Sequence, residues 1–96
     1  RAALRELASL RAQVTASQQA LGDAQQGRAT LVADQARIRE NMSAVPDDSD
    51  LSRRYLDELS RQEDRLAELD ASIERMRGAL RDAELRVTEY VRSLSL

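Results

Sequence analysis

Apolar residues recur along this chain at the alternating three- and four-residue spacing of a coiled coil. One pair of series starts at Ala3 and Leu7, and a second pair starts at Tyr55 and Leu59. None of these series contains a stutter. A strict seven-residue repeat predicts two long helices that pack through their a and d positions, here called the seam, with a left-handed supercoil.

A break centred on Pro46 separates the two pairs of series. Proline removes a backbone donor and biases Val45 away from helical angles, so the first helix should stop there. Ser49 is the favoured N-cap of the second helix, and Asp50 would place negative charge at the positive end of its dipole. The expected elements are a helix over 2–45, a turn over 46–49 and a helix over 50–95. The prediction is an all-α, antiparallel two-helix coiled-coil hairpin that forms one domain over 1–96.

A single register pairs the two helices along their whole length, in which the numbers of facing residues add to 97. It sets Ile38 against Leu59 and Leu10 against Val87. Arg28, at a seam position, falls opposite an apolar residue. The same register brings together four pairs of opposite charge: Asp34 with Arg65, Arg11 with Glu84, Arg39 with Glu63, and Glu6 with Arg86. Exposed pairs of this kind help to choose orientation more than they stabilise.

The only two glutamines of the seam, Gln35 and Gln62, meet in one layer of this register. A buried amide pair joined by hydrogen bonds would penalise slipped registers, as polar seam residues do in coiled coils. The alternative is a chance meeting of two tolerated polar residues. We expect these glutamines to act as a register pair.

Four e positions, which lie beside the seam and are usually polar in a two-stranded coil, are apolar here: Leu4, Val32, Leu56 and Val91. Two of them, Leu4 and Val91, fall together with Leu94 and Leu96 at the open end and form a surface that a solitary hairpin would expose. Because helical periodicity is already in phase at Ala3, we expect a fragment of a larger protein that covers this surface. The rival hypothesis is weak self-association of two hairpins into a four-helix bundle.

A polar cluster is expected beside the turn. Its members are Arg39, Asn41, Arg54, Tyr55, Glu58 and Glu63. The ring of Tyr55 should pack on Met42 while its hydroxyl reaches the polar rim. The cluster is interpreted as a lock for the bend, with a recognition site as the alternative.

Composition narrows the chemistry. The chain has no Cys and no His, so it offers no thiolate, no imidazole base and no zinc site of the usual ligand types. The acidic turn, with Asp47, Asp48 and Asp50, lacks the glycine and terminal glutamate of a calcium loop. A net charge of −2 with interleaved acids and bases does not favour nucleic-acid binding. We expect no catalytic, cofactor or metal site and no membrane insertion, a protein as the partner, and we leave the cellular compartment open.

Two stretches flanking the turn, DQARIREN at 34–41 and RRYLDELSRQEDRLAEL at 53–69, are more distinctive than a generic coil requires. They resemble the coiled-coil segment of the bacterial mucoidy-inhibitor-A-like proteins. The matching residues are Gln35, Arg37, Arg39, Asn41, Arg54, Tyr55, Leu59, Gln62 and Glu63. The resemblance implies a long, partly helical protein, possibly associated with the cell envelope, and supplies no catalytic residue.

Periplasmic efflux adaptors have a similar outline and remain an alternative. Their tip signature of Arg, Leu and Ser or Thr at seven-residue steps is missing, because Arg37 leads to Ala44 and Arg39 leads to Pro46. The sequence therefore favours a non-catalytic structural or protein–protein interaction arm that spaces or docks the domains of a parent protein.

Overall fold

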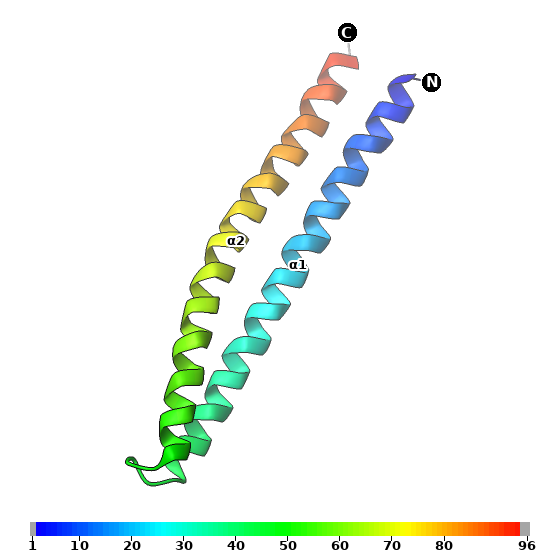
Figure 1. Ribbon diagram of the computed structural model, residues 1–96. Helices are drawn as coiled ribbons and strands as arrows, with labels where there is room; N and C mark the ends of the chain where they lie inside the picture. The colour runs from blue at the N-terminus through cyan, green and yellow to red at the C-terminus, as the bar shows by residue number, and fades with distance from the viewer. Residues whose placement is uncertain (1, 95–96) are drawn as a thin grey trace. The chain divides into compact units, whose positions relative to one another are not determined.

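The computed structural model describes residues 2–94, which form two helices, α1 (Ala2–Ser43) and α2 (Asp50–Leu94) (Figure 1). These described residues contain no strand. The helices run antiparallel and pack against each other, which confirms the predicted all-α two-helix hairpin. Contacts divide the chain into two units: the turn unit, Gln25–Ala71, and the terminal unit, whose described residues are 2–24 and 72–94. Each unit is described by itself below.

In the turn unit, α1 ends at Ser43, two residues before the expected end at Val45. The backbone N–H groups of Ala44 and Val45 donate to carbonyls three residues earlier, at 3.1 and 3.2 Å. This tightened last turn satisfies carbonyls that a helix end leaves without partners. The restriction that Pro46 places on Val45 explains why the helix cannot continue.

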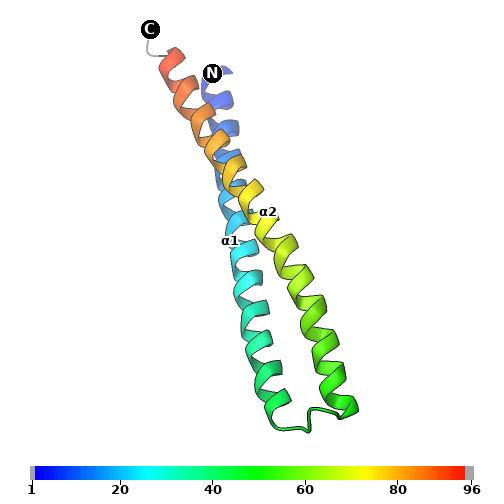
Figure 2. The same ribbon diagram turned by 90° about the vertical axis from the view of Figure 1, so that its left-hand side faces the viewer.

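Ser49 caps α2, as the sequence predicts. Its Oγ accepts a hydrogen bond from the backbone N–H of Ser52 at 3.0 Å and donates to the carbonyl of Pro46 at 2.7 Å. Arg53 pairs with Asp50 and also donates to the carbonyl of Asp48 at 2.8 Å. Side-chain and backbone bonds thus fix the point at which the chain turns back into α2, at the foot of Figure 2.

The seam of the turn unit follows the heptad pattern. Gln35, Ile38 and Ser52 are buried, and Ile38 has no exposed surface at all. The remaining seam positions are half-buried: Arg28, Leu31, Met42, Val45, Tyr55, Leu59, Gln62, Leu66 and Leu69. The a and d positions therefore form the contact between the two helices here, as the pattern predicts.

The terminal unit repeats this arrangement. Leu10, Ile73 and Ala83 are buried. Half-buried seam positions are Ala3, Leu7, Val14, Ser17, Leu21, Ala24, Met76, Leu80, Val87 and Tyr90. Leu94, the last described seam residue, is exposed. Tyr90 donates its hydroxyl to the carbonyl of Ala3 at 3.4 Å, which ties α2 to the first turn of α1.

Polar contacts between the helices agree with the predicted register. Arg28 bonds Asp70 and Gln35 bonds Glu63, pairs whose numbers add to 98, and Gln62 bonds Asp34, a pair that adds to 96. All three pairs lie one position away from the expected value of 97. A slip by one heptad would change that value by seven, so these contacts in the turn unit exclude it.

The stretch over 12–27, which carries a single charge and two glycines, is helical throughout. A Cβ built on Gly22 or Gly27 would meet nothing within 4 Å. No contact among the described residues therefore requires glycine at either position, although each glycine weakens a helix by about 0.8–1 kcal/mol relative to alanine.

Truncating Ile38 to alanine should lower the free energy of unfolding by about 2–5 kcal/mol, because the side chain is wholly buried and its removal leaves a cavity. Leu56→Ala is the matched control: Leu56 is 54% exposed, so its truncation should change stability by about 0.5 kcal/mol or less. Urea unfolding followed by circular dichroism measures both. Equal losses for the two variants would contradict the assigned seam.

Candidate functional site

The two seam glutamines form a polar layer in the turn unit, but they do not bond each other. Gln35 donates its Nε2 to Glu63 Oε1 at 3.0 Å, and Gln62 donates its Nε2 to Asp34 Oδ2 at 2.7 Å. Each amide thus reaches the carboxylate next to the other glutamine. The expected direct amide pair is wrong in this respect, because a carboxylate is a stronger acceptor than an amide oxygen.

One atom of this polar layer lacks a partner. Gln62 Oε1 is buried and accepts no hydrogen bond. Exchanging the amide oxygen and nitrogen would point that oxygen at Asp34, where two acceptors would repel, so the observed orientation is the chemically sensible one. An unsatisfied buried acceptor costs about 1–3 kcal/mol. The polar layer is therefore a place where stability is lower than the fold would allow.

Charges hold the outer ends of the polar layer. Arg37 donates to Asp34 at 2.9 Å, and Arg39 lies 3.8 Å from Glu63. The hydrogen bond from Arg37, followed by that from Gln62, lowers the pKa of Asp34 below its ordinary value of 3.8. The pKa of Arg37 is raised in turn, chiefly by its bond to Asp34. Asp34 is consequently held in its ionised form, in which it accepts the hydrogen bond of Gln62.

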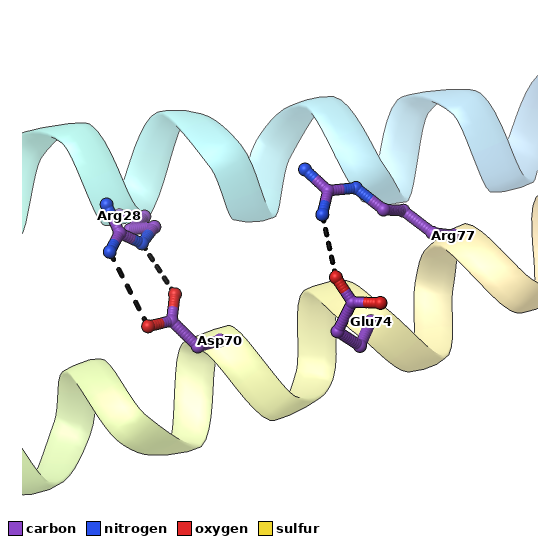
Figure 3. A network of polar contacts seen from close by, with 4 residues as sticks. All are labelled: Arg28, Asp70, Glu74 and Arg77. Carbon is purple, nitrogen blue, oxygen red and sulfur yellow. Dashed lines mark hydrogen bonds and ion pairs between the residues drawn. The ribbon is translucent and has the colours of Figure 1, made fainter.

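Arg28 makes a contact that the sequence reasoning missed. It occupies a seam position, yet its Nε donates to Asp70 Oδ1 at 2.5 Å and its Nη2 to Oδ2 at 3.5 Å (Figure 3). A long guanidinium side chain can leave an apolar layer and reach a charge at its edge. The signal was present in the sequence, because Asp70 directly follows Leu69, the residue expected opposite Arg28. The bond lowers the pKa of Asp70.

The charge pairs expected from the register form only in part. Arg39 and Glu63 are paired. Asp34 binds Arg37 and Gln62 in place of Arg65. Within residues 2–94, neither Glu6 with Arg86 nor Arg11 with Glu84 comes within ion-pair distance. Three arginines pair with a carboxylate three residues away on their own helix, as Arg77 does with Glu74 in Figure 3, whereas Arg28 and Arg39 pair with the other helix.

The expected turn cluster is brought together only partly. Arg39 and Glu63 meet, and Glu58 and Tyr55 lie close enough to Arg37 to raise its pKa. The contact of Asn41 is through its backbone carbonyl, which accepts from Ala44. In the described part of the chain, the side chains of Asn41 and Arg54 and the hydroxyl of Tyr55 make no hydrogen bond. Glu63 joins the cluster to the polar layer through Gln35, and Arg37, which was assigned no role in the cluster, also lies beside it.

The terminal unit carries an open groove of about 340 Å³ between its two helices. The lining residues are Arg11, Val14 and Thr15 from α1 and Glu84 and Val87 from α2. In the predicted register, Val14 faces Ala83, which is buried and small. A small seam residue leaves the space above it unfilled, and this accounts for the groove.

The apolar e positions are exposed in both units. In the terminal unit, Leu4 is 70% and Val91 is 39% exposed; in the turn unit, Val32 is 40% and Leu56 is 54% exposed. Leu96 lies outside the described residues. The hairpin's own seam therefore does not cover these side chains.

Residues 2–94 contain no group of three or more acidic, histidine or cysteine side chains placed to hold a metal ion. Neither of the two helices, over the part described, is long and apolar enough to cross a membrane. A scan against models of protein families, a search of curated proteins and a search of solved structures each found no match to this chain.

Replacing both Gln35 and Gln62 by leucine should raise the free energy of unfolding by about 1–3 kcal/mol, because it removes an unsatisfied buried acceptor and adds apolar contact. The same change should loosen the register. Urea unfolding measures stability. Disulfide formation from cysteine pairs measures register, with Leu31 and Leu66 as the in-register pair and Leu31 and Leu59 as the pair one heptad away.

In the chain with the native glutamines, only the in-register cysteine pair should form a disulfide. In the double leucine variant, both cysteine pairs should form one. Exposed Gln19→Leu and Gln26→Leu are the controls, because they make the same change outside the seam. A more stable double variant that still links only the in-register pair would remove the register role of the polar layer.

Stability should fall on acidification as Asp34 and Asp70 lose their bonds. Both have a lowered pKa in the folded chain, so their contribution is present above the ordinary value of 3.8 and disappears as the pH falls through the lower folded values. The melting temperatures of the native chain and of the Asp34→Asn, Asp70→Asn double variant should differ at pH 6, begin to converge only below about pH 4, and meet once the pH is below the folded pKa values. Asp57→Asn is the exposed control, and a difference that persists at low pH would contradict this account.

Proposed function

We propose that this chain is a non-catalytic interaction arm, a two-helix hairpin that docks a protein partner or a domain of its own parent protein along one edge. One observation supports the proposal: at five positions beside the seam of the turn unit, the usual polarity of the two edges is inverted. Apolar Val32 and Leu56 are exposed on the e edge. Polar Asp34, Asn41 and Glu58, all at g positions on the other edge, are half-buried.

This inversion is the reverse of what a free hairpin would be expected to have. Burial of a large apolar side chain stabilises a fold by about 1.5–3 kcal/mol, whereas burial of a carboxylate opposes folding unless it is bonded. Asp34 is bonded, to Arg37 and Gln62. Exposed apolar side chains at e positions, on the opposite side of the seam from a bonded carboxylate, suit a surface that meets another protein.

Spacing of parent domains is part of the same proposal, since a pair of packed helices is a suitable structure for a spacer. The resemblance to the mucoidy-inhibitor-A-like coiled coils would place such an arm in a bacterial protein. Its matching residues include Gln35, Gln62 and Glu63 of the polar layer. A polar layer that fixes register suits an arm whose edge must present residues at set positions.

The test is photocrosslinking in cells that express the protein carrying this chain, with a photoreactive amino acid at Val32 or Leu56. We expect a crosslink to one defined protein, or to one defined segment of the same polypeptide. Ala33 and Asp57 are matched controls, because each is exposed and one residue along the same helix, which turns it about 100° away from the e edge. Equal crosslinking from apolar and control positions would overturn the proposal.

A further inference from the structure

The groove of the terminal unit lies between two opposite charges without partners. Arg11 lines it from α1 and Glu84 from α2. Within residues 2–94, neither side chain takes part in an ion pair or a hydrogen bond. The groove floor is apolar, formed by Val14 and Val87. The groove therefore has an apolar floor, a positively charged edge on α1 and a negatively charged edge on α2.

Arg11 and Glu84 occupy e positions, and the e positions of the two helices fall beside each other in pairs. By the heptad assignment, these e pairs are Leu4 with Val91, Arg11 with Glu84, and Gln18 with Arg77. Successive e pairs are seven residues apart, or about 10 Å along the helices. In the Arg11–Glu84 pair the two residues have opposite charge, and in the Leu4–Val91 pair both residues are apolar.

We propose that a second copy of this chain docks on this edge of the terminal unit, related by a two-fold axis parallel to the helices. Such an axis sets α1 of one copy against α2 of the other. The α1 residue of each e pair then faces the α2 residue of the same pair in the other copy. Arg11 of one copy then faces Glu84 of the other, twice, and Leu4 faces Val91, twice. This inference rests on the proposed function, that the hairpin is a contact arm, and names the partner at one edge.

Self-complementarity favours a second copy over an unrelated protein. A two-fold interface requires that a residue and its partner exchange places across the axis, and the unpaired Arg11 and Glu84 satisfy this requirement without any further charge. The α1 positions next to these e positions are small: Ala8, Thr15 and Gly22. Small residues there let a neighbouring helix approach closely.

The size of the face predicts a weak dimer. The described part of α1 in the terminal unit is about 34 Å long, and two helices side by side are about 20 Å wide. Two copies would thus bury about 1,300 Å² in total, which is at the low end of specific interfaces. In the turn unit, Arg39 and Glu63 of the e edge already pair with each other, so the same charge exchange is not offered there.

Charge exchange between two variants tests the proposal. Arg11→Glu makes both edges of the groove negative, and Glu84→Arg makes both edges positive. By sedimentation equilibrium from micromolar to millimolar chain, the native protein should show a monomer–dimer equilibrium, and each variant alone should stay monomeric. An equimolar mixture of the two variants should form a heterodimer at least about tenfold more tightly than either variant forms a homodimer.

Arg5→Glu and Asp82→Arg are the controls, since they make the same changes of charge at exposed positions of the terminal unit outside the groove lining. They should leave the native dimer unchanged, and circular dichroism should show equal helicity in all variants. A native chain that is monomeric at every concentration would overturn the proposal. So would a dimer indifferent to Arg11 and Glu84, or a mixture without heterodimer. Crosslinks from Val32 and Leu56 to another protein would survive each of these results.

Discussion

Everything else in this hairpin depends on one constraint, the burial of two heptad rows against each other in a single register. Hydrophobic burial contributes about 25 cal/mol per Å² of apolar surface removed from water, and two helices alone cover most seam residues only in part. Leu10, Ile38, Ile73 and Ala83 are the only apolar residues that are buried in the described chain. The seam therefore has little stability in reserve, and devices that fix its alignment matter more here than in a globular core.

We interpret the polar layer as one of these devices, in which alignment is favoured at a cost in stability. A leucine at Gln35 and Gln62 would add apolar contact, but it would pack equally well after a slip by one heptad. The crossed amides do not have this freedom, because each needs a carboxylate at one position on the opposite helix: Glu63 for one and Asp34 for the other. Arg37 holds Asp34 in place, so the register is specified by geometry at both ends of the polar layer.

Much of this fold can be predicted from the sequence, because heptad spacing depends on residues that are close to each other along the chain. The seam rows, the Ser49 cap and the register follow from spacing, from one proline and from the only two glutamines at seam positions. Side-chain partners do not follow in the same way. Arg28 was expected to lie against Leu69, but its length lets it reach Asp70, and Asp34 took a partner on its own helix. Long charged side chains sample many positions at similar energy, so spacing alone does not choose between them.

The end of α1 shows the same division. A helical pattern that includes Val45 is visible in the sequence, but whether the last residues keep full helical geometry depends on how the chain must leave toward Ser49. The N–H groups of Ala44 and Val45 bond carbonyls three residues earlier because the chain turns here toward Ser49. The heptad pattern does not predict these hydrogen bonds, since the path of the turn determines them.

The e and g positions at the edges of the seam connect the fold to the proposed function. A sequence selected only to hold two helices together would place Leu56 and Leu4 where the partner helix covers them, and it would leave Glu58 and Asp34 in water. Leu4 and Leu56 are instead exposed at e positions, and Asp34 and Glu58 are half-buried at g positions. Each exposed leucine lacks the stabilisation of about 1.5–3 kcal/mol that burial provides. Because the hairpin alone does not use that stabilisation, these positions support the proposal that this edge contacts another protein surface.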